Sequence, residues 1–465
     1  MTSNSAFSPD PLKDWTEQAG TLSDSNTRDE IVSSIFQASR SICDASVMYA
    51  NKERVKTEKI DRILTSPLWG FPIMLAILGV IFWITIAGAN VPSGMIAELF
   101  SAAEVKLTLL FQAIHAPAWL HGMLVLGFFR GTGWVISVML PPMVIFFPIF
   151  ALLENYGYLP RVAFNMDRLF KGAGAHGKQS LTMAMGFGCN AAAIMSTRII
   201  ESPRERTLAI LTNNFVPCNG RWPTLILLAS LFMAATYTGG MATLVTAATV
   251  MGMVLIGIVV TLTVSWTLSK TLLRGVPTHY TLELPPYRRP KVLHTIFRAS
   301  LDKSWNVLKR AVIVAAPASI VTWVLANINI GDTSVLMHIV NFLDPFGKAL
   351  GLDGFIVAAF ILGLPANEIV VPILLMGYLS TGALTDIQDM AELKHIFLAH
   401  GWTWLTALNM MLFSLLHYPC GTTLFNIYQE TKSAKWTFLS FAIPTALAVL
   451  VTYIVATVVR SFGLL

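Results

Sequence analysis

Long apolar runs alternate with shorter polar stretches along most of this chain. About 20 apolar residues in helical conformation are needed to cross the hydrocarbon core of a bilayer. Because the runs are this long and carry few charges, the pattern predicts an all-α, polytopic membrane protein with about eight transmembrane helices. The expected helices start near Leu68, Gly133, Leu208, Leu244, Arg310, Gly354, Trp402 and Lys435.

The same pattern divides the chain into five parts. Residues 1–66 are a polar cytoplasmic lead-in, with helical periodicity from about 28 to 62. Residues 67–128 hold the first transmembrane helix and an amphipathic segment that we expect at the outer interface. A first membrane module (129–269), a basic cytoplasmic linker (270–309) and a second module with the C-terminal helix (310–465) follow.

The charges indicate how the chain is oriented. Lys and Arg exceed Asp and Glu by 32 to 26 and cluster beside the apolar runs, most densely in residues 270–310. Loops near 235–242 and 329–342 contain neither Lys nor Arg. By the positive-inside rule, the basic loops and the N-terminus face the cytoplasm, and the two loops without Lys or Arg face outward. The positive charge is thus explained by the lipid bilayer, and no nucleic-acid partner is expected.

An internal repeat relates residues 166–190 to residues 343–367 at a constant offset of 177 residues. The first copy lies in a basic stretch and is expected on the cytoplasmic side, whereas the second lies among Asp residues and is expected outside. Inverted repeats of this kind are typical of transporters, whose substrate site lies near the midplane where helices are broken. The matched pairs are Asp167 and Asp344, Lys171 and Lys348, Gly174 and Gly351, Gly177 and Gly354, Gly186 and Gly363, and Asn190 and Asn367.

The stretch GAGAHGKQ, residues 172–179, comes within one residue of a phosphate-binding loop. Such a loop needs Ser or Thr after the lysine to hold magnesium, and it follows a strand. Here Gln179 takes that place and the preceding segment is helical, while the second copy of the repeat keeps the glycines without the Gly-Lys pair. We interpret the stretch as a turn between two helices. We therefore expect no bound nucleotide in this chain, and a transporter rather than an enzyme.

Glycine and proline interrupt the apolar runs in both modules. Unwound backbone inside a membrane must be satisfied by protein, water or an ion, so these breaks can build a binding site. The expected breaks are Gly186 and Gly188 in GFGCN, Pro217 in VPCNGRWP, Pro365 in LGLPANE and Pro419 in HYPCGTT.

Groups that bind cations accompany every break. A thiol, an amide and a carboxylate together suit a divalent transition metal better than magnesium or calcium, but leave iron, zinc, cobalt and manganese open. A membrane cysteine is also often simple packing, and Glu368 could instead pair with Arg221. No fixed zinc motif is present, so a passing ion is favoured over a resident one. The candidate ligands are Cys189, Cys218, Cys420, Asn190, Asn367 and Glu368.

At these motifs, and at LLENYGY, LELPPYR and the last helix, the sequence resembles the membrane part of the FeoB family of ferrous iron transporters. The resemblance implies Fe²⁺ as the transported ion, two inverted gate modules and a place in the cytoplasmic membrane. It also implies that the three membrane cysteines and Glu368 are family positions, with Glu154 as a further acidic one. The residues around Cys218 depart from the family pattern.

The resemblance further implies partners. Family members normally begin with a G domain, so we expect GTP hydrolysis on a separate G-domain protein that docks on the lead-in. A small FeoA-like cytoplasmic protein is a second expected partner, and a homo-oligomer is compatible with the sequence. The alternative functions are a nucleoside or other small-solute permease, a GTP-dependent enzyme, and a membrane protein without cargo.

Overall fold

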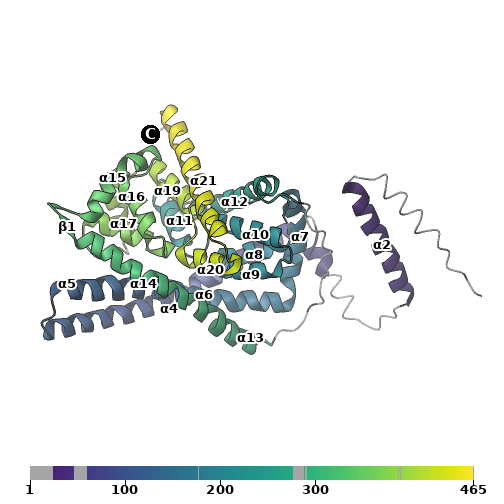
Figure 1. Ribbon diagram of the computed structural model, residues 1–465, viewed down its shortest axis with the longest axis horizontal. Coiled ribbons are helices and arrows are strands. Elements are labelled where there is room, and N and C mark those ends of the chain that lie inside the picture. The colour runs from purple at the N-terminus through teal and green to yellow at the C-terminus, as the bar shows by residue number, and fades with distance from the viewer. Residues whose placement is uncertain are drawn as a thin grey trace, which may run out of the picture. The chain divides into compact units, whose positions relative to one another are not determined.

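The computed structural model describes residues 25–46, 60–66, 68–175, 177–275, 287, 291–385, 387 and 389–463. The chain forms two units, residues 1–59 and 60–465. In the first unit, α2 (Ser25–Ser46) is a single helix, which agrees with the helical periodicity expected from about residue 28 for the part up to residue 46 (Figure 1). The rest of the predicted lead-in helix up to residue 59 lies outside the described residues. All other elements belong to the second unit.

Long helices account for five of the expected transmembrane runs, those near Leu68, Gly133, Leu244, Arg310 and Lys435. Three are continuous: α4 (Gly70–Ala113), α12 (Gly240–Lys270) and α21 (Ala434–Ser461). The other two change pitch along their length. One joins α5 (Ala118–His121), η1 (Gly122–Phe129) and α6 (Arg130–Tyr156), and the other joins α13 (Val292–Arg298), η5 (Ala299–Ser304) and α14 (Trp305–Asn327).

The other three expected runs are bent or broken. The run near Gly354 begins with α16 (Gly354–Leu362), which is bent by 111° against the preceding helix α15 (Val335–Ala349). The run near Trp402 is bent by 105° against the preceding helix α18 (Met390–Ala399) and divides into α19 (Trp404–Leu416) and α20 (Gly421–Thr431). The run near Leu208 divides into α10 (Pro203–Thr212), η3 (Asn213–Phe215), α11 (Trp222–Leu228) and η4 (Ala229–Met233).

These bends confirm a polytopic helical protein but change the helix count. Among the described residues, five helices can span a membrane alone, and up to seven if each bent pair counts once, rather than eight. The physical reason is that glycine and proline remove helix hydrogen bonds or permit other backbone angles. Apolar runs near residues 208, 354 and 402 therefore supply short helices instead of straight spans.

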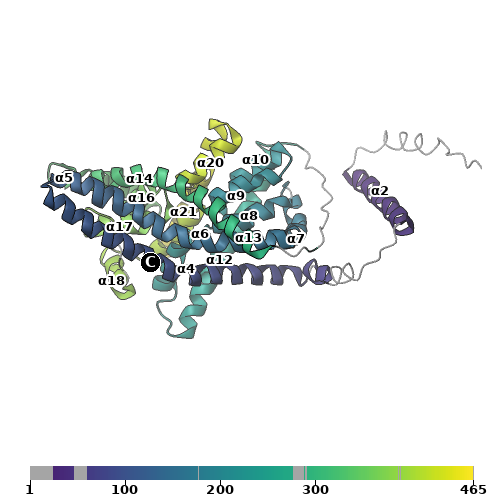
Figure 2. The same cartoon turned by 90° about the horizontal axis from the view of Figure 1, so that it is seen from below.

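The first long helix also differs from expectation. We expected the amphipathic segment after the first span to be a separate element, but α4 continues for 44 residues through Pro92. A proline removes one backbone donor, a loss that helices in membranes tolerate when neighbours compensate. Helix α4 runs beside α6, as Figure 2 shows, and Glu104 accepts hydrogen bonds from Arg130.

The repeat predicted from the sequence is present in the backbone. Helices α7 (Tyr158–Gly172) and α15 have the same length and start 177 residues apart. Each ends in a turn whose glycine, Gly174 or Gly351, has a φ of +70°. The turn interpretation of GAGAHGKQ is thereby confirmed, because this left-handed conformation favours glycine.

Matched side chains hold the two turns in the same way. Asp167 binds Lys171 at 2.7 Å and Asp344 binds Lys348 at 2.6 Å. The amide of Gly177 donates to Asp167 at 3.0 Å, and in the second copy the corresponding glycine amide donates to Asp344 at 3.1 Å. The same polar contacts therefore recur in both copies, which makes a chance match of the two sequences untenable.

One ion pair joins three distant parts of the chain. Arg161 on α7 is buried and donates to both carboxylate oxygens of Asp61 at 3.0 Å, and Tyr287 of the basic linker donates to Asp61 at 2.8 Å. Burial and this hydrogen bond raise the pKa of Tyr287. The end of the lead-in, the first module and the linker are thus tied together.

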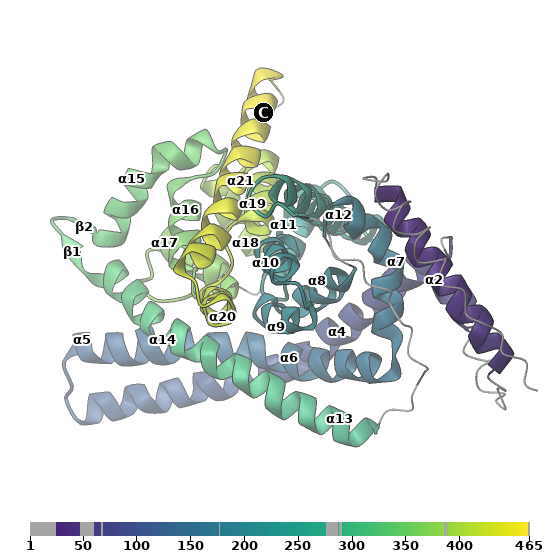
Figure 3. The same cartoon turned by 45° about the vertical axis from the view of Figure 1, so that its right-hand side comes forward.

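The broken elements pack beside the long helices, and α15 and α18 among them lie at the edge of the unit (Figure 2 and Figure 3). Besides those named, they are α8 (Lys178–Gly188), α9 (Asn190–Ser196), η2 (Thr197–Ile199), η6 (Asn367–Ile369) and α17 (Val370–Leu379). A two-stranded antiparallel hairpin, β1 (Asn329–Ile330) and β2 (Thr333–Ser334), precedes α15.

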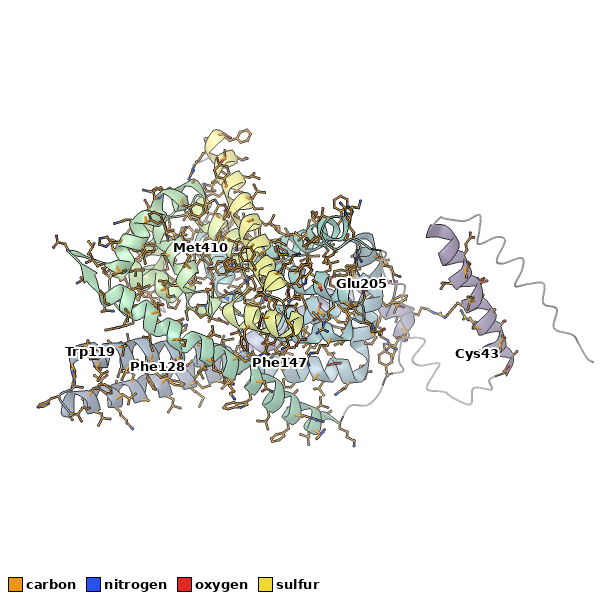
Figure 4. The ribbon with its side chains drawn as sticks, viewed as in Figure 1. Cys43, Trp119, Phe128, Phe147, Glu205 and Met410 are labelled. Atoms are coloured by element: carbon orange, nitrogen blue, oxygen red, sulfur yellow. The ribbon has the colours of Figure 1, made fainter. Side chains whose placement is uncertain are left out.

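Apolar side chains cover the outside of this unit as well as its interior. Phe147 and Met410 are fully buried, whereas Trp119 is 61% exposed and Phe128 is 39% exposed (Figure 4). An exterior this apolar is stable against lipid and unfavourable against water. The exposed residues thus support the membrane assignment.

The repeated turns yield a stability prediction. We expect Gly174→Ala and Gly351→Ala each to destabilise the protein by about 1 kcal/mol or more, because alanine is strained at positive φ. The added methyl groups would also press on Ser269 and Asn409. Thermal unfolding in detergent measures the change. Gly172→Ala is the control, since open space surrounds that position, and equal melting temperatures for all three variants would contradict the prediction.

Candidate functional site

Each module contains one break at the same place in the repeat. In the first, Cys189 separates α8 from α9 with an extended backbone, φ −157° and ψ 119°. In the second, Ala366 precedes η6 with φ −152° and ψ 121°. The two residues are 177 positions apart, so the repeat reproduces the break itself, and Asn190 and Asn367 follow it in both copies.

The two Pro-Cys segments pack against these breaks. The amide of Asn219 donates to the carbonyl of Gly188 at 3.2 Å, and the amide of Gly421 donates to the carbonyl of Leu364 at 2.7 Å. Each segment therefore satisfies a carbonyl that its own module's break leaves without a helical partner. This pairing brings Cys218 next to the first break and Cys420 next to the second.

All four unwound segments meet at one small cavity of about 30 Å³. A cavity needs about 10–15 Å³ to hold one water molecule, so this one has room for an ion with little of its hydration shell. All six candidate ligands and two of the predicted helix-break residues line it. Its lining is Met139, Met143, Gly188, Cys189, Asn190, Cys218, Asn219, Gly220, Pro365, Ala366, Asn367, Glu368, Cys420, Thr422 and Thr423.

Oxygen acceptors at this cavity are incompletely satisfied. The side-chain oxygen of Asn367 is buried and has no hydrogen-bond partner in the described part of the chain. A buried acceptor without a partner costs about 1–3 kcal/mol, which a bound cation would offset. The thiol of Cys420 contacts the hydroxyl of Thr423 at 3.2 Å.

Asn213 is a site residue that the sequence interpretation missed. Its side-chain amide donates to the side-chain oxygen of Asn190 at 3.3 Å, and both residues are buried. Gly186, a predicted break residue, lies inside helix α8, where an added Cβ would come within 3.1 Å of Asn213 and 3.2 Å of Asn190. The signal was present as NNFVPC, because an amide three or four residues before the break at Pro217 can turn toward it, but nothing local selects Asn213 over Asn214.

Glu368 lies between the small cavity and a larger one. The larger cavity, of about 490 Å³, is lined by α4, α6, α11, α17 and α18, and shares Asn219, Gly220 and Glu368 with the smaller one. The carboxylate of Glu368 packs on Gly220, where any side chain would collide with it. We call the larger cavity the vestibule.

Arg221 does not form the expected ion pair with Glu368. It is fully buried and donates to the backbone carbonyls of Asn214, Leu415, His417 and Tyr418 at 2.7–3.2 Å, and to the side-chain oxygen of Asn214 at 3.1 Å. Four carbonyls near the breaks at Pro217 and Pro419 surround its guanidinium, which carries five N–H donors in a fixed geometry. Arg221 therefore ties the two modules together.

Glu154, the further acidic position that the resemblance implies, and His417, which lies next to the Pro419 break, do not line the cavity. Glu154 is exposed at the end of α6. His417 is buried, and its Nδ1 is within hydrogen-bonding distance of the carbonyls of Phe413 and Ser414. Within the described ranges, no three His, Cys, Asp or Glu side chains are grouped closely enough to hold a metal ion. The thiols, amides and carboxylate line one route without forming a closed metal cage.

The contacts of Arg221 yield a second prediction. We expect Arg221→Met to destabilise the protein by about 3 kcal/mol or more, because several buried carbonyls lose their donor, while Glu368→Gln leaves stability nearly unchanged. The two effects should add in the double variant, since the residues do not pair. Thermal unfolding in detergent measures all three. A coupling free energy above about 1 kcal/mol between the two substitutions would contradict this prediction and indicate that Arg221 and Glu368 form an ion pair.

Two family comparisons match most of the second unit. Residues 136–232 and 308–434 match the Gate family, described as "Nucleoside recognition", and residues 250–301 match "Ferrous iron transport protein B C terminus". The two Gate segments coincide with the two modules that carry the breaks. No solved structure matches this chain.

Curated relatives match over most of the chain. The Fe(2+) transporter FeoB of Staphylococcus aureus strain COL is 30% identical over 409 residues, 86% of this chain and 58% of that protein. The FeoB of Campylobacter jejuni is 28% identical over 423 residues, 88% of this chain and 66% of its own. A Porphyromonas gingivalis protein named "Fe(2+) transport protein A/Fe(2+) transporter FeoB fusion protein" is 28% identical over 447 residues, 86% of this chain and 51% of that protein.

The chain thus spans less than two thirds of the length of these relatives. Within this chain, the family matches cover the two Gate segments and the FeoB C-terminal segment that lies between them. The chain belongs to the FeoB family and corresponds to its membrane part.

Proposed function

We propose that this chain moves Fe²⁺ into the cytoplasm through the small cavity and the vestibule. The observation that carries the proposal is the meeting of both modules' breaks at one cavity with three thiols, two amides and one carboxylate. Sulfur and oxygen donors together favour a divalent transition metal. Relatives named Fe(2+) transporters support iron among the metals that this chemistry allows.

The geometry suggests an order of events. The vestibule is lined by the N-terminal half of α6, at Trp134, Val138 and Pro142, away from the basic residues that follow that helix. A hydrated ion would enter there, meet Glu368 and lose water on passing Asn219 and Gly220. It would then contact Cys189, Cys218 and Cys420 in turn. Several weak sites in series let an ion leave again, as transport requires.

A nucleoside or other small-solute permease is the second candidate. The small cavity is too small for a nucleoside in this conformation, but the vestibule falls within the range of about 300–1,000 Å³ typical of small-molecule sites. Trp134, Trp222 and Asn90 there offer stacking and amide contacts. Competition by uridine against metal uptake distinguishes this candidate from the first.

Two protein partners are also proposed, a small FeoA-like protein and a separate G-domain protein. A small FeoA-like protein is suggested by the relative whose name joins transport protein A to FeoB. Control by a separate G-domain protein that docks on residues 1–66 is suggested by the family resemblance alone, as are the cytoplasmic membrane and the cytoplasmic N-terminus.

Metal-resolved uptake tests the iron proposal. Proteoliposomes containing this chain should take up Fe²⁺, compared side by side with Mn²⁺, Zn²⁺ and Co²⁺. We expect Cys189→Ser, Cys218→Ser and Cys420→Ser together to reduce iron uptake or selectivity about tenfold or more, because a hydroxyl is a poorer ligand for this metal than a thiol. Cys43→Ser is the control, since Cys43 is exposed on α2. Unchanged iron uptake in the triple variant would show that these cysteines do not act as iron ligands.

Co-purification tests the proposed GTP-dependent control. An affinity-tagged chain expressed in its own host should retain a GTP-binding protein, and removal of residues 1–66 should release it. Transport should then respond to GTP only when both are present. Full transport by the chain alone, with no GTP-binding protein retained, would contradict this proposal.

A further inference from the structure

Helices α9 and α20 lead away from the cavity side by side (Figure 3). Each begins directly after a cavity cysteine, α9 after Cys189 and α20 after Cys420. Helix α9 belongs to the first module and α20 to the second. The region between these two helices therefore connects the candidate ion site with the end of the molecule where α20 stops.

One face of α20 is polar and buried over its full length. Cys420, Thr423, Asn426 and Glu430 are separated by three, three and four residues, which keeps them on one side of a helix. Thr423 and Asn426 are each 1% exposed, and the side chain of Glu430 is 5% exposed. Ten residues of helix extend about 15 Å. A row of sulfur and oxygen atoms thus runs from the cavity to the far end of α20. We call these four side chains, from Cys420 to Glu430, the ladder.

Arginines bind the two oxygen-bearing side chains of this ladder that lie farthest from the cavity, Asn426 and Glu430. Asn426 accepts a hydrogen bond from Arg310 on α14, and its amide donates to the carbonyl of Ala191 on α9 at 3.0 Å. Glu430 accepts from Arg198 at 2.6–3.1 Å and also from Arg206 on α10. Two guanidinium groups from the first module therefore hold one carboxylate from the second.

An apolar cluster lies beside the ladder. Ile194 on α9, Ile210 on α10 and Ile427 on α20 pack together and are almost fully buried. Apolar side chains at this point exclude water, and a cation cannot pass them without a hydration shell or oxygen ligands. The two arginines at Glu430 leave a net positive charge beyond the cluster, which also repels a cation.

We propose that the Cys420–Glu430 face of α20 lines the inner half of the ion path, and that Arg198, Arg206 and Arg310 keep it closed by occupying its oxygen atoms. This proposal rests on the proposed function for the identity of the cation. Opening requires α20 to separate from α9 and α10, which frees Asn426 and Glu430 to bind the departing divalent cation. The ion pairs at Glu430 are partly exposed, since the Arg198 side chain is 70% and the Arg206 side chain 30% exposed. Exposed ion pairs contribute little to stability, so a role in closure is a distinct claim from a structural one.

Accessibility of Cys420 tests closure without any transport measurement. In a Cys43→Ser, Cys189→Ser, Cys218→Ser background, a membrane-impermeant maleimide is applied to inverted vesicles, whose cytoplasmic face is outside. We expect Arg198→Ala with Arg206→Ala, and separately Glu430→Gln, to raise the labelling rate of Cys420 about tenfold, because either change favours the open population. A variant that combines these changes should label Cys420 only slightly faster than either change alone, because both break the same contact between Glu430 and the arginines.

Arg204→Ala is the matched control. Arg204 lies on α10 two residues before Arg206, but it donates to the carbonyls of Leu273 and Gly174 instead of Glu430. Its variant should label at the starting rate. Size-exclusion chromatography checks folding, and Arg206→Lys, which keeps the charge but loses the planar guanidinium, gives a milder opening should the alanine variants not fold.

The outcomes separate this proposal from the iron proposal. Equal labelling of Cys420 in all folded variants would overturn closure by the arginines, whatever the protein transports. Faster labelling confined to the Arg198, Arg206 and Glu430 variants would support it. Faster labelling of Cys420 in these variants, together with no Fe²⁺ uptake in proteoliposomes by the chain with all its cysteines intact, would support the closed inner path and refute iron as its cargo.

Discussion

The structure depends on satisfying backbone that is unwound inside an apolar interior. A carbonyl left without a partner there costs several kcal/mol. The protein meets this constraint with its own groups: Asn219 and Gly421 donate to Gly188 and Leu364, and Arg221 donates to carbonyls of both Pro-Cys segments. Because main-chain and guanidinium donors satisfy these carbonyls, the sulfur and amide side chains of the same segments remain available to the cavity.

Charge is distributed unevenly along the proposed path. Glu368, at the junction of the vestibule and the cavity, has no ion-pair partner among the residues described, whereas Glu430 at the other end holds two arginines. An unpaired carboxylate attracts a cation, and a paired one surrounded by guanidinium groups does not. The two ends therefore differ in a way that suits an ion entering past Glu368 and stopping before Glu430 until α20 moves.

The two modules contribute different parts of one site, although they descend from one pattern. The repeat preserves the turn, its aspartate and the extended break residue, but places Cys189 in one copy and Ala366 in the other. Sulfur thus comes from the first break and both Pro-Cys segments, and the carboxylate from the second break. A site shared between modules in this way changes when they move relative to each other, which is the requirement for alternating access.

The sequence alone determined the helical membrane class, the repeat, the glycine turns at Gly174 and Gly351 and the breaks at the three prolines, whereas Gly186 lies inside a helix. These depend on apolar periodicity and on the backbone angles of glycine and proline, which act locally. Only the tertiary structure decided the partners of Arg221, the contact of Asn213 with Asn190, the continuity of α4 and the arginines around Glu430. Arg221 contacts residues almost 200 positions away. Such contacts follow from how segments pack together, and no local pattern specifies which of several acceptors a side chain will meet.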